Sequence, residues 1–233
     1  MTAFSIQANV LVICWPDRKA QYFLLLLFVS LFFFSIVIAD GGGVSPKVMA
    51  WVESKYGESA KTRIMDWQEL IARNQGVDEL SQLKLVNDFF NETPYYPDDE
   101  IWGKEDYWAT PVEMLSIDGA DCEDYSIAKY FTLREMGVPV EKLRITYVKA
   151  LDLNQAHMVL AYYAYPDAEP VVLDNLIGQI KAASKRQDLA PIYSFNGDGL
   201  WLAKSRGKGR RVGQSDRISL WQDLITKMEN ESD

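Results

Sequence analysis

The feature that most constrains the fold is a change in hydrophobic periodicity around Gly137 and Pro139. Before this point apolar residues recur three and four positions apart, which predicts amphipathic helices. Beyond it the pattern is that of strands, with short apolar runs at 144–150, 157–164, 170–174 and 199–203. Helices followed by strands favour an α+β fold with a helical N-terminal lobe and an antiparallel β-sheet.

The helical half contains three predicted helices. The first begins with Ser45 as its N-cap and Pro46 in its first turn. A second apolar stripe at helical spacing covers residues 64–71, Gly76 interrupts the pattern, and a third stripe covers residues 80–90. We therefore expect the chain up to residue 90 to be mainly helical.

Residues 91–120 separate these helices from the centre of the chain. This stretch is rich in Pro, Gly, Asp and aromatic residues, which predicts a long ordered loop, and such loops are usually functional. A helix of about four turns then begins near Cys122 and ends at Gly137, as the spacing of its apolar residues indicates. A last helical pattern covers residues 216–228.

The N-terminal segment has the pattern of an export signal. Residues 22–39 are apolar apart from two serines, and two basic residues at 18–19 precede them. Cleavage before Asp40 would remove the segment, whereas retention would leave an anchor that can span a bilayer. We expect a signal peptide or membrane anchor at 1–39 and one exported domain at 40–233, since 233 residues suffice for one good core.

Export makes the cysteines informative. Cys14 precedes the apolar run and cannot join the exported domain, so Cys122 is left as a free thiol in an oxidising compartment. A thiol reacts as the thiolate, and the unpaired N–H groups and positive dipole end at a helix N-terminus lower its pKa. The position of Cys122 at a predicted helix start is therefore that of a nucleophile.

A nucleophilic thiol needs a base, and His157 is the single histidine of the chain. Asp174 ends the following strand and can orient the imidazole if the two strands pair. The three residues give a Cys-His-Asp triad in the element order of papain-like α+β folds. Each residue type alone is also common in purely structural positions, so the prediction rests on their combination.

Acidic residues crowd the predicted nucleophile. The chain carries a formal charge of -9, which argues against nucleic acid as a partner, and Asp121, Glu123 and Asp124 flank Cys122 directly. Each charge about 7 Å away costs the thiolate roughly 1 kcal/mol at an effective dielectric of about 40. A hard cation with oxygen ligands would neutralise them, and export exposes the site to calcium. The alternative is a purely structural role, in which these acids only cap the helix.

The sequence around Cys122 resembles a known family. The motifs are DYWATP at 106–111 and DCEDY at 121–125, followed after 35 residues by the histidine of AHMVL and after 17 more by the aspartate of VLDNL. They are similar to the bacterial transglutaminase-like cysteine proteinases, above all to the LapG type, the periplasmic proteases of biofilm adhesin release. The resemblance extends over most of residues 45–225.

This resemblance implies a papain-like or transglutaminase-like cysteine peptidase with Cys122 as nucleophile, His157 as base and Asp174 as its orienter. It implies that Asp121, Glu123 and Asp124 contribute to a calcium site required for activity. It also implies a periplasmic protein that cuts a large surface adhesin near its N-terminus, controlled by the periplasmic domain of a cyclic-di-GMP-sensing inner-membrane receptor. An acyltransferase with the same triad and a noncatalytic calcium-dependent binding module are the alternatives.

Overall fold

The structure is a computed structural model that describes residues 43–202 and 209–232. The expected export segment at 1–39, with Cys14, lies outside these residues. Across the described part of the chain, none of the helices combines the length and the apolar character that a membrane crossing requires.

The N-terminal lobe contains the three expected helices, α2 (Pro46–Tyr56), α3 (Glu58–Arg73) and α4 (Glu79–Phe90). Ser45 caps α2 as expected, since its hydroxyl accepts the backbone N–H of Val48 at 3.3 Å. Gly57 joins α2 to α3 with a φ of 88°, a conformation that glycine adopts without steric cost. The predicted helical lobe is thus confirmed.

The stretch 91–120 differs from the loop that the sequence predicts, because it contains α5 (Asp98–Ile101) and α6 (Pro111–Ile117). A capping box starts α6: Glu113 N–H donates to the Thr110 hydroxyl at 3.0 Å, and Thr110 N–H donates to the Glu113 carboxylate at 2.9 Å. Such reciprocal bonds satisfy the first N–H groups of a helix and stabilise even a short one.

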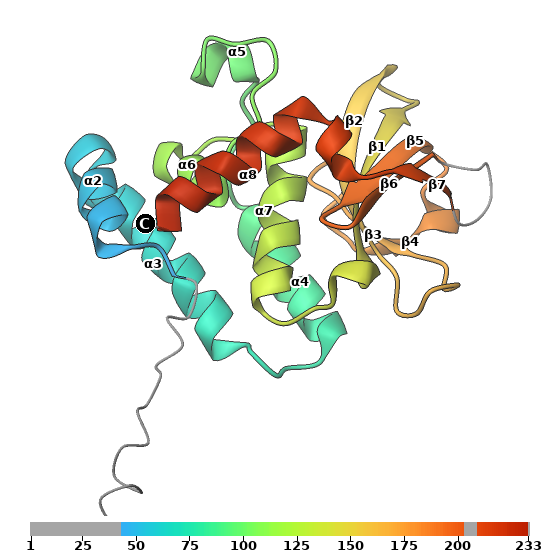
Figure 1. The fold of residues 1–233 in the computed structure, drawn as a ribbon, viewed down its shortest axis with the longest axis horizontal. Helices are drawn as coiled ribbons and strands as arrows, with labels where there is room; N and C mark the ends of the chain where they lie inside the picture. The colour runs from blue at the N-terminus through green and yellow to red at the C-terminus, as the bar shows by residue number, and fades with distance from the viewer. Residues whose placement is uncertain (1–42, 203–208, 233) are drawn as a thin grey trace, which may run out of the picture. The chain divides into compact units, whose positions relative to one another are not determined.

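The C-terminal half forms one seven-stranded antiparallel sheet in the order β4-β3-β2-β1-β5-β6-β7 (Figure 1). The strands are β1 (Leu143–Ala150), β2 (Gln155–Tyr162), β3 (Val171–Leu173), β4 (Lys181–Ala182), β5 (Leu189–Asn196), β6 (Gly199–Leu202) and β7 (Arg210–Gly213). Single 3-10 turns lie before β1 at Val140–Lys142 (η1), between β4 and β5 at Ala183–Lys185 (η2) and before the last helix at Ser215–Arg217 (η3).

Three of these strands were not expected from the sequence. β4 has only two residues. β7 begins with two arginines and lacks the alternation of apolar and polar residues that predicts a strand. β5 contains Pro191, which lacks the N–H that a strand interior uses. The register between β5 and β1 shifts beside Val148, the partner of Pro191, and a bulge of this kind accommodates proline.

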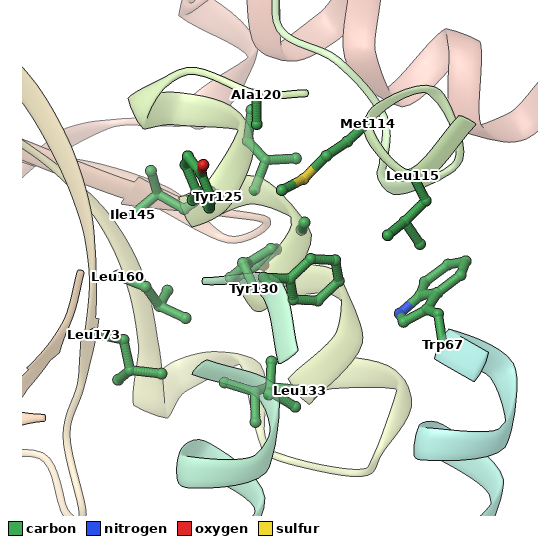
Figure 2. Close-up of a cluster of buried hydrophobic side chains, with 14 of the residues drawn as sticks. Trp67, Met114, Leu115, Ala120, Tyr125, Tyr130, Leu133, Ile145, Leu160 and Leu173 are labelled. Carbon is green, nitrogen blue, oxygen red and sulfur yellow. The ribbon is translucent and has the colours of Figure 1, made fainter. Parts of the chain in front are cut away.

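Helix α7 (Cys122–Glu135) lies between the helical lobe and the sheet and is buried over most of its length. Figure 2 shows Tyr130 and Leu133 of this helix between sheet residues on one side and Trp67 of α3 on the other. The last helix, α8 (Ser219–Ser232), stacks Trp221 on Phe131 with ring centroids 5.5 Å apart. A fully buried side chain of this size contributes about 1.5–3 kcal/mol, so packing on several sides fixes the helix that begins with Cys122.

Candidate active site

Cys122 is the first residue of α7 and is partly buried. Its sulfur lies 3.1 Å from Oε2 of Glu123. The backbone of Met158 on β2 faces this thiol and acts to lower its pKa. Since Met158 directly follows His157, the structure places the thiol between the first turn of α7 and the part of β2 that carries the histidine.

His157 and Asp174 form a buried pair. Nε2 of His157 lies 2.8 Å from Oδ1 of Asp174, and each residue is only 2% exposed. The pairing follows from the sheet, because β2 and β3 are antiparallel neighbours with Leu160 opposite Leu173, and Asp174 comes directly after β3. The structure therefore brings together the two residues whose strands the sequence predicts to pair, and Nδ1 is the imidazole nitrogen that Asp174 does not occupy.

The Asp174 carboxylate is held by further donors. Leu176 N–H donates to Oδ1 at 3.0 Å, and Nη2 of Arg186 donates to Oδ2 at 2.6 Å. Burial acts to raise the pKa of Asp174, but the hydrogen bond and charge of His157 and the hydrogen bonds from Leu176 N–H and Arg186 hold the pKa below its usual range. Asp174 is thus an ionised orienter for the imidazole.

The acidic cluster at the start of α7 is larger than the sequence indicates. Oxygens of Asp98, Asp121 and Asp124 lie within 4.8 Å of one another, and oxygens of Asp98, Asp106 and Glu123 do the same. Asp98 opens α5 and Asp106 follows it, so both come from the stretch expected as a loop. The run of acids at 98–106 was the available signal, but only the fold shows which of them reach Cys122.

Burial dominates the electrostatics of this cluster. It raises the pKa of Asp121, Glu123 and Asp124, and the neighbouring carboxylates add to the effect. Burial also raises the pKa of the Cys122 thiol, followed by the charges of Glu123 and Asp121. The sequence argument that these acids oppose the thiolate holds, although desolvation is the larger cause. Without compensation the helix N-terminus does not suffice to form a thiolate.

The cluster has the donor set of a hard-cation site. Within the described residues, none of its five carboxylates forms a salt bridge. Oδ1 of Asp98 and Oδ1 of Asp121 are buried without a hydrogen-bond partner. An orphaned buried polar atom costs about 1–3 kcal/mol, more if charged. Oxygen-only ligands suit calcium or magnesium.

The oxygens of Asp124 are already used by the backbone. They accept the N–H of Ala109 at 2.7 Å and that of Asp121 at 3.3 Å. Asp98 similarly accepts Tyr107 N–H at 2.5 Å. Asp124 therefore ties the loop before α6 to the start of α7.

Helix α8 holds the same loop from outside. Nζ of Lys227 donates to the carbonyl oxygen of Trp108 at 2.6 Å and to Glu113 at 2.8 Å. The Thr110 hydroxyl donates to Glu231 at 2.7 Å. The C-terminal end of the loop that carries Asp98 and Asp106 is thus held by both α7 and α8.

A partly buried thiol opening a helix, set against a sheet with a buried His-Asp pair, is the arrangement of papain-like and transglutaminase-like cysteine peptidases. Comparison with protein families gives the same class, because the model of the bacterial transglutaminase-like cysteine proteinases matches residues 45–189. The chain belongs to this family and is a cysteine peptidase. A comparison with curated proteins finds no significant match.

Solved structures of LapG from Legionella pneumophila are similar to this chain. The EGTA-treated form is 44% identical with a TM-score of 0.70, and the alignment covers 78% of this chain and 96% of that one. The calcium-bound form is 43% identical with a TM-score of 0.68, covering 78% and 97%. These matches confirm the predicted α+β transglutaminase-like fold.

Proposed function

We propose that this protein is a calcium-dependent periplasmic cysteine endopeptidase that cleaves the N-terminal region of a large surface adhesin. Cleavage would release the adhesin and disperse the biofilm, under control of a cyclic-di-GMP-sensing membrane receptor. The observation that carries the proposal is the buried His157–Asp174 pair, in which His157 lies on β2 directly before Met158, the residue whose backbone faces the Cys122 thiol.

In this proposal Cys122 is the nucleophile and His157 the base that takes its proton. Asp174 holds Nε2 of the imidazole, which leaves Nδ1 to exchange protons with the thiol and with the leaving amine. The thiolate attacks the scissile carbonyl, and backbone N–H groups at the start of α7, including that of Cys122, stabilise the oxyanion. His157 then protonates the amine, and water hydrolyses the thioester with His157 as base.

We propose that Asp121, Glu123 and Asp124 contribute to a calcium site, joined by Asp98 and Asp106, whose carboxylate oxygens lie in the same cluster. The orphaned oxygens of Asp98 and Asp121 support this assignment. A bound cation would neutralise the carboxylates beside Cys122 and so favour its thiolate. The choice of calcium is supported by the solved structures of LapG, one of which is calcium-bound and another EGTA-treated.

The substrate, the receptor and the periplasmic location rest on the family. The motifs at 106–111 and 121–125 are similar to the LapG type, and the apolar segment at 22–39 supports export. Fractionation of cells that produce the full chain tests the location. Recovery in the cytoplasm would contradict export, and recovery in the membrane fraction would indicate a retained anchor.

The decisive experiment is to incubate the purified protein with N-terminal fragments of candidate surface adhesins, with calcium or with EGTA, and to sequence the products. Cys122→Ala serves as the matched control. We expect one cut, a free carboxyl terminus and a requirement for both Cys122 and calcium. An amine adduct in place of the free carboxylate would indicate acyl transfer instead. The absence of any product would favour the noncatalytic binding module.

A further inference from the structure

The two carboxylate oxygens of Asp174 have different partners. Oδ1 faces Nε2 of His157 and also accepts Leu176 N–H, whereas Oδ2 accepts Nη2 of Arg186 at 2.6 Å. A carboxylate that turned about its side-chain torsion would exchange these oxygens and move the acceptor away from the imidazole. The contact with Arg186 opposes this rotation.

Arg186 is itself fixed. Its side chain is 1% exposed and follows the 3-10 turn η2, which begins at Ala183. Nε and Nη2 donate to the carboxylate of Asp188 at 3.0 and 2.7 Å. The planar guanidinium therefore bridges two carboxylates, a geometry that the point charge of a lysine cannot reproduce.

The charges around Asp174 leave Arg186 as its direct cationic partner. The groups that face this carboxylate are His157 from β2, Arg186 after η2, and Lys129 from α7, with the acidic Asp188 beyond Arg186. Lys129 donates to the side-chain oxygens of Asn87 and Asn91 and not to Asp174.

We propose that Arg186 is a positioning residue for the peptidase reaction, which holds Asp174 so that one oxygen stays directed at His157 and fixes the imidazole tautomer. The inference rests on the proposed roles of Cys122, His157 and Asp174. Arg186 does not touch the reacting atoms and acts through Asp174 alone.

The test compares Arg186→Met and Arg186→Lys with Arg144→Met as matched control. Arg144 is another buried arginine of the sheet, with its guanidinium 4.2 Å from the ring centre of Trp201 and no contact to the triad. Two quantities are measured: kcat and KM for cleavage, and the imidazole spectrum of ¹⁵N-histidine-labelled protein. Because His157 is the single histidine, protein without a histidine tag gives an unambiguous signal.

We expect Arg186→Met to lower kcat about 10- to 100-fold, the loss typical when an outer partner of a functional side chain is removed, with KM changed less than about threefold. The wild-type spectrum should show one tautomer with its proton on Nε2, and Arg186→Met should show a second state or exchange broadening. Arg186→Lys should lie between the two, and Arg144→Met should change neither kcat nor the spectrum.

An unchanged spectrum or an unchanged kcat in folded Arg186→Met overturns the proposal. If that variant does not fold, Arg186→Lys and Asp188→Asn decide it by the same two measurements, because Asp188→Asn loosens the anchor of Arg186 and leaves its charge. Wild-type protein that fails to cleave in a Cys122-dependent way would refute the proposed function, and the spectrum would still show whether Arg186 orients His157.

Discussion

The two sides of the Cys122 thiol carry buried charge in opposite ways. On the sheet side, His157, Asp174, Arg186 and Asp188 form a chain in which each charged group meets a partner within 3.0 Å. On the helix side, Asp98 and its neighbours gather carboxylates without a salt bridge among the described residues. The paired side is preorganised by the fold itself, whereas the acidic side lacks a counter-charge.

This difference indicates which side of the thiol responds to pH and to bound cations. A buried charge with a partner stays ionised, while unpaired buried carboxylates raise their pKa or bind a cation. We therefore expect the sheet side to determine the geometry of the reaction and the acidic side to determine when the thiol is reactive.

Replacing Cys122 with alanine should lower cleavage on the order of 10⁴-fold or more, because loss of a nucleophile removes the covalent route. Folding should be nearly unchanged, since the side chain is small and only partly buried. Circular dichroism and a thermal melt check the fold, and product formation checks activity. Cleavage at the wild-type rate would exclude Cys122 as the nucleophile.

Asp98→Asn should weaken calcium binding, since it removes one of the carboxylate charges of the cluster. Calcium at about 100 times its dissociation constant should stabilise the wild type by about 2.7 kcal/mol, or several degrees in Tm, and the variant by much less at the same concentration. Asp99→Asn, at the exposed neighbouring position, is the matched control. An equal calcium-induced shift in Tm in both variants would show that Asp98 is not a metal ligand.

The stability of metal-free protein should fall as pH rises from about 5 to 8. Asp121 and Glu123 have folded pKa values raised above the ordinary 3.8 and 4.5, so the folded state binds more protons than the unfolded state in this window. The slope of stability against pH is then negative. Thermal melts in EGTA measure it, and calcium should flatten the slope. A metal-free Tm that rises over this window would contradict the unpaired character of the cluster.

The smallest effect should come from Lys129→Met on α7. Lys129 is 1% exposed, and burial lowers its pKa to about 7, so its folded state loses a proton that the unfolded state keeps up to about 10.5. Lys129 should therefore contribute a rise in stability between about pH 7 and 10.5, which thermal melts of the wild type in calcium should show and the variant should lack. The orphaned amide oxygens of Asn87 and Asn91 should cost roughly 1 kcal/mol in a denaturant titration. An identical pH profile in both proteins would contradict a buried, neutralised lysine.

Much of the fold could be predicted from the sequence, because caps and periodicity are local signals. Ser45, Pro46 and the apolar stripes marked the helices, and β1, β2, β3 and β6 followed from their apolar runs. β5 could not be predicted, since Pro191 depends on a bulge set by β1. α6 carried a readable signal in its Thr110–Glu113 capping box.

The site was predictable where a residue type is rare, as with the single histidine and the single cysteine of the described chain. The pairing of His157 with Asp174 followed from neighbouring strands. Asp98, Asp106 and Arg186 could not be assigned, because acids and arginines are common and their roles depend on contacts formed only in the folded chain.

On this account Cys122 becomes reactive when a cation neutralises the acidic side. The most direct measurement is the rate at which iodoacetamide alkylates Cys122 at neutral pH, followed by mass spectrometry of its peptide, with calcium and with EGTA. We predict alkylation about tenfold faster or more with calcium, since one unit of thiol pKa changes the thiolate population tenfold. Equal rates, or a faster rate in EGTA, would contradict the account.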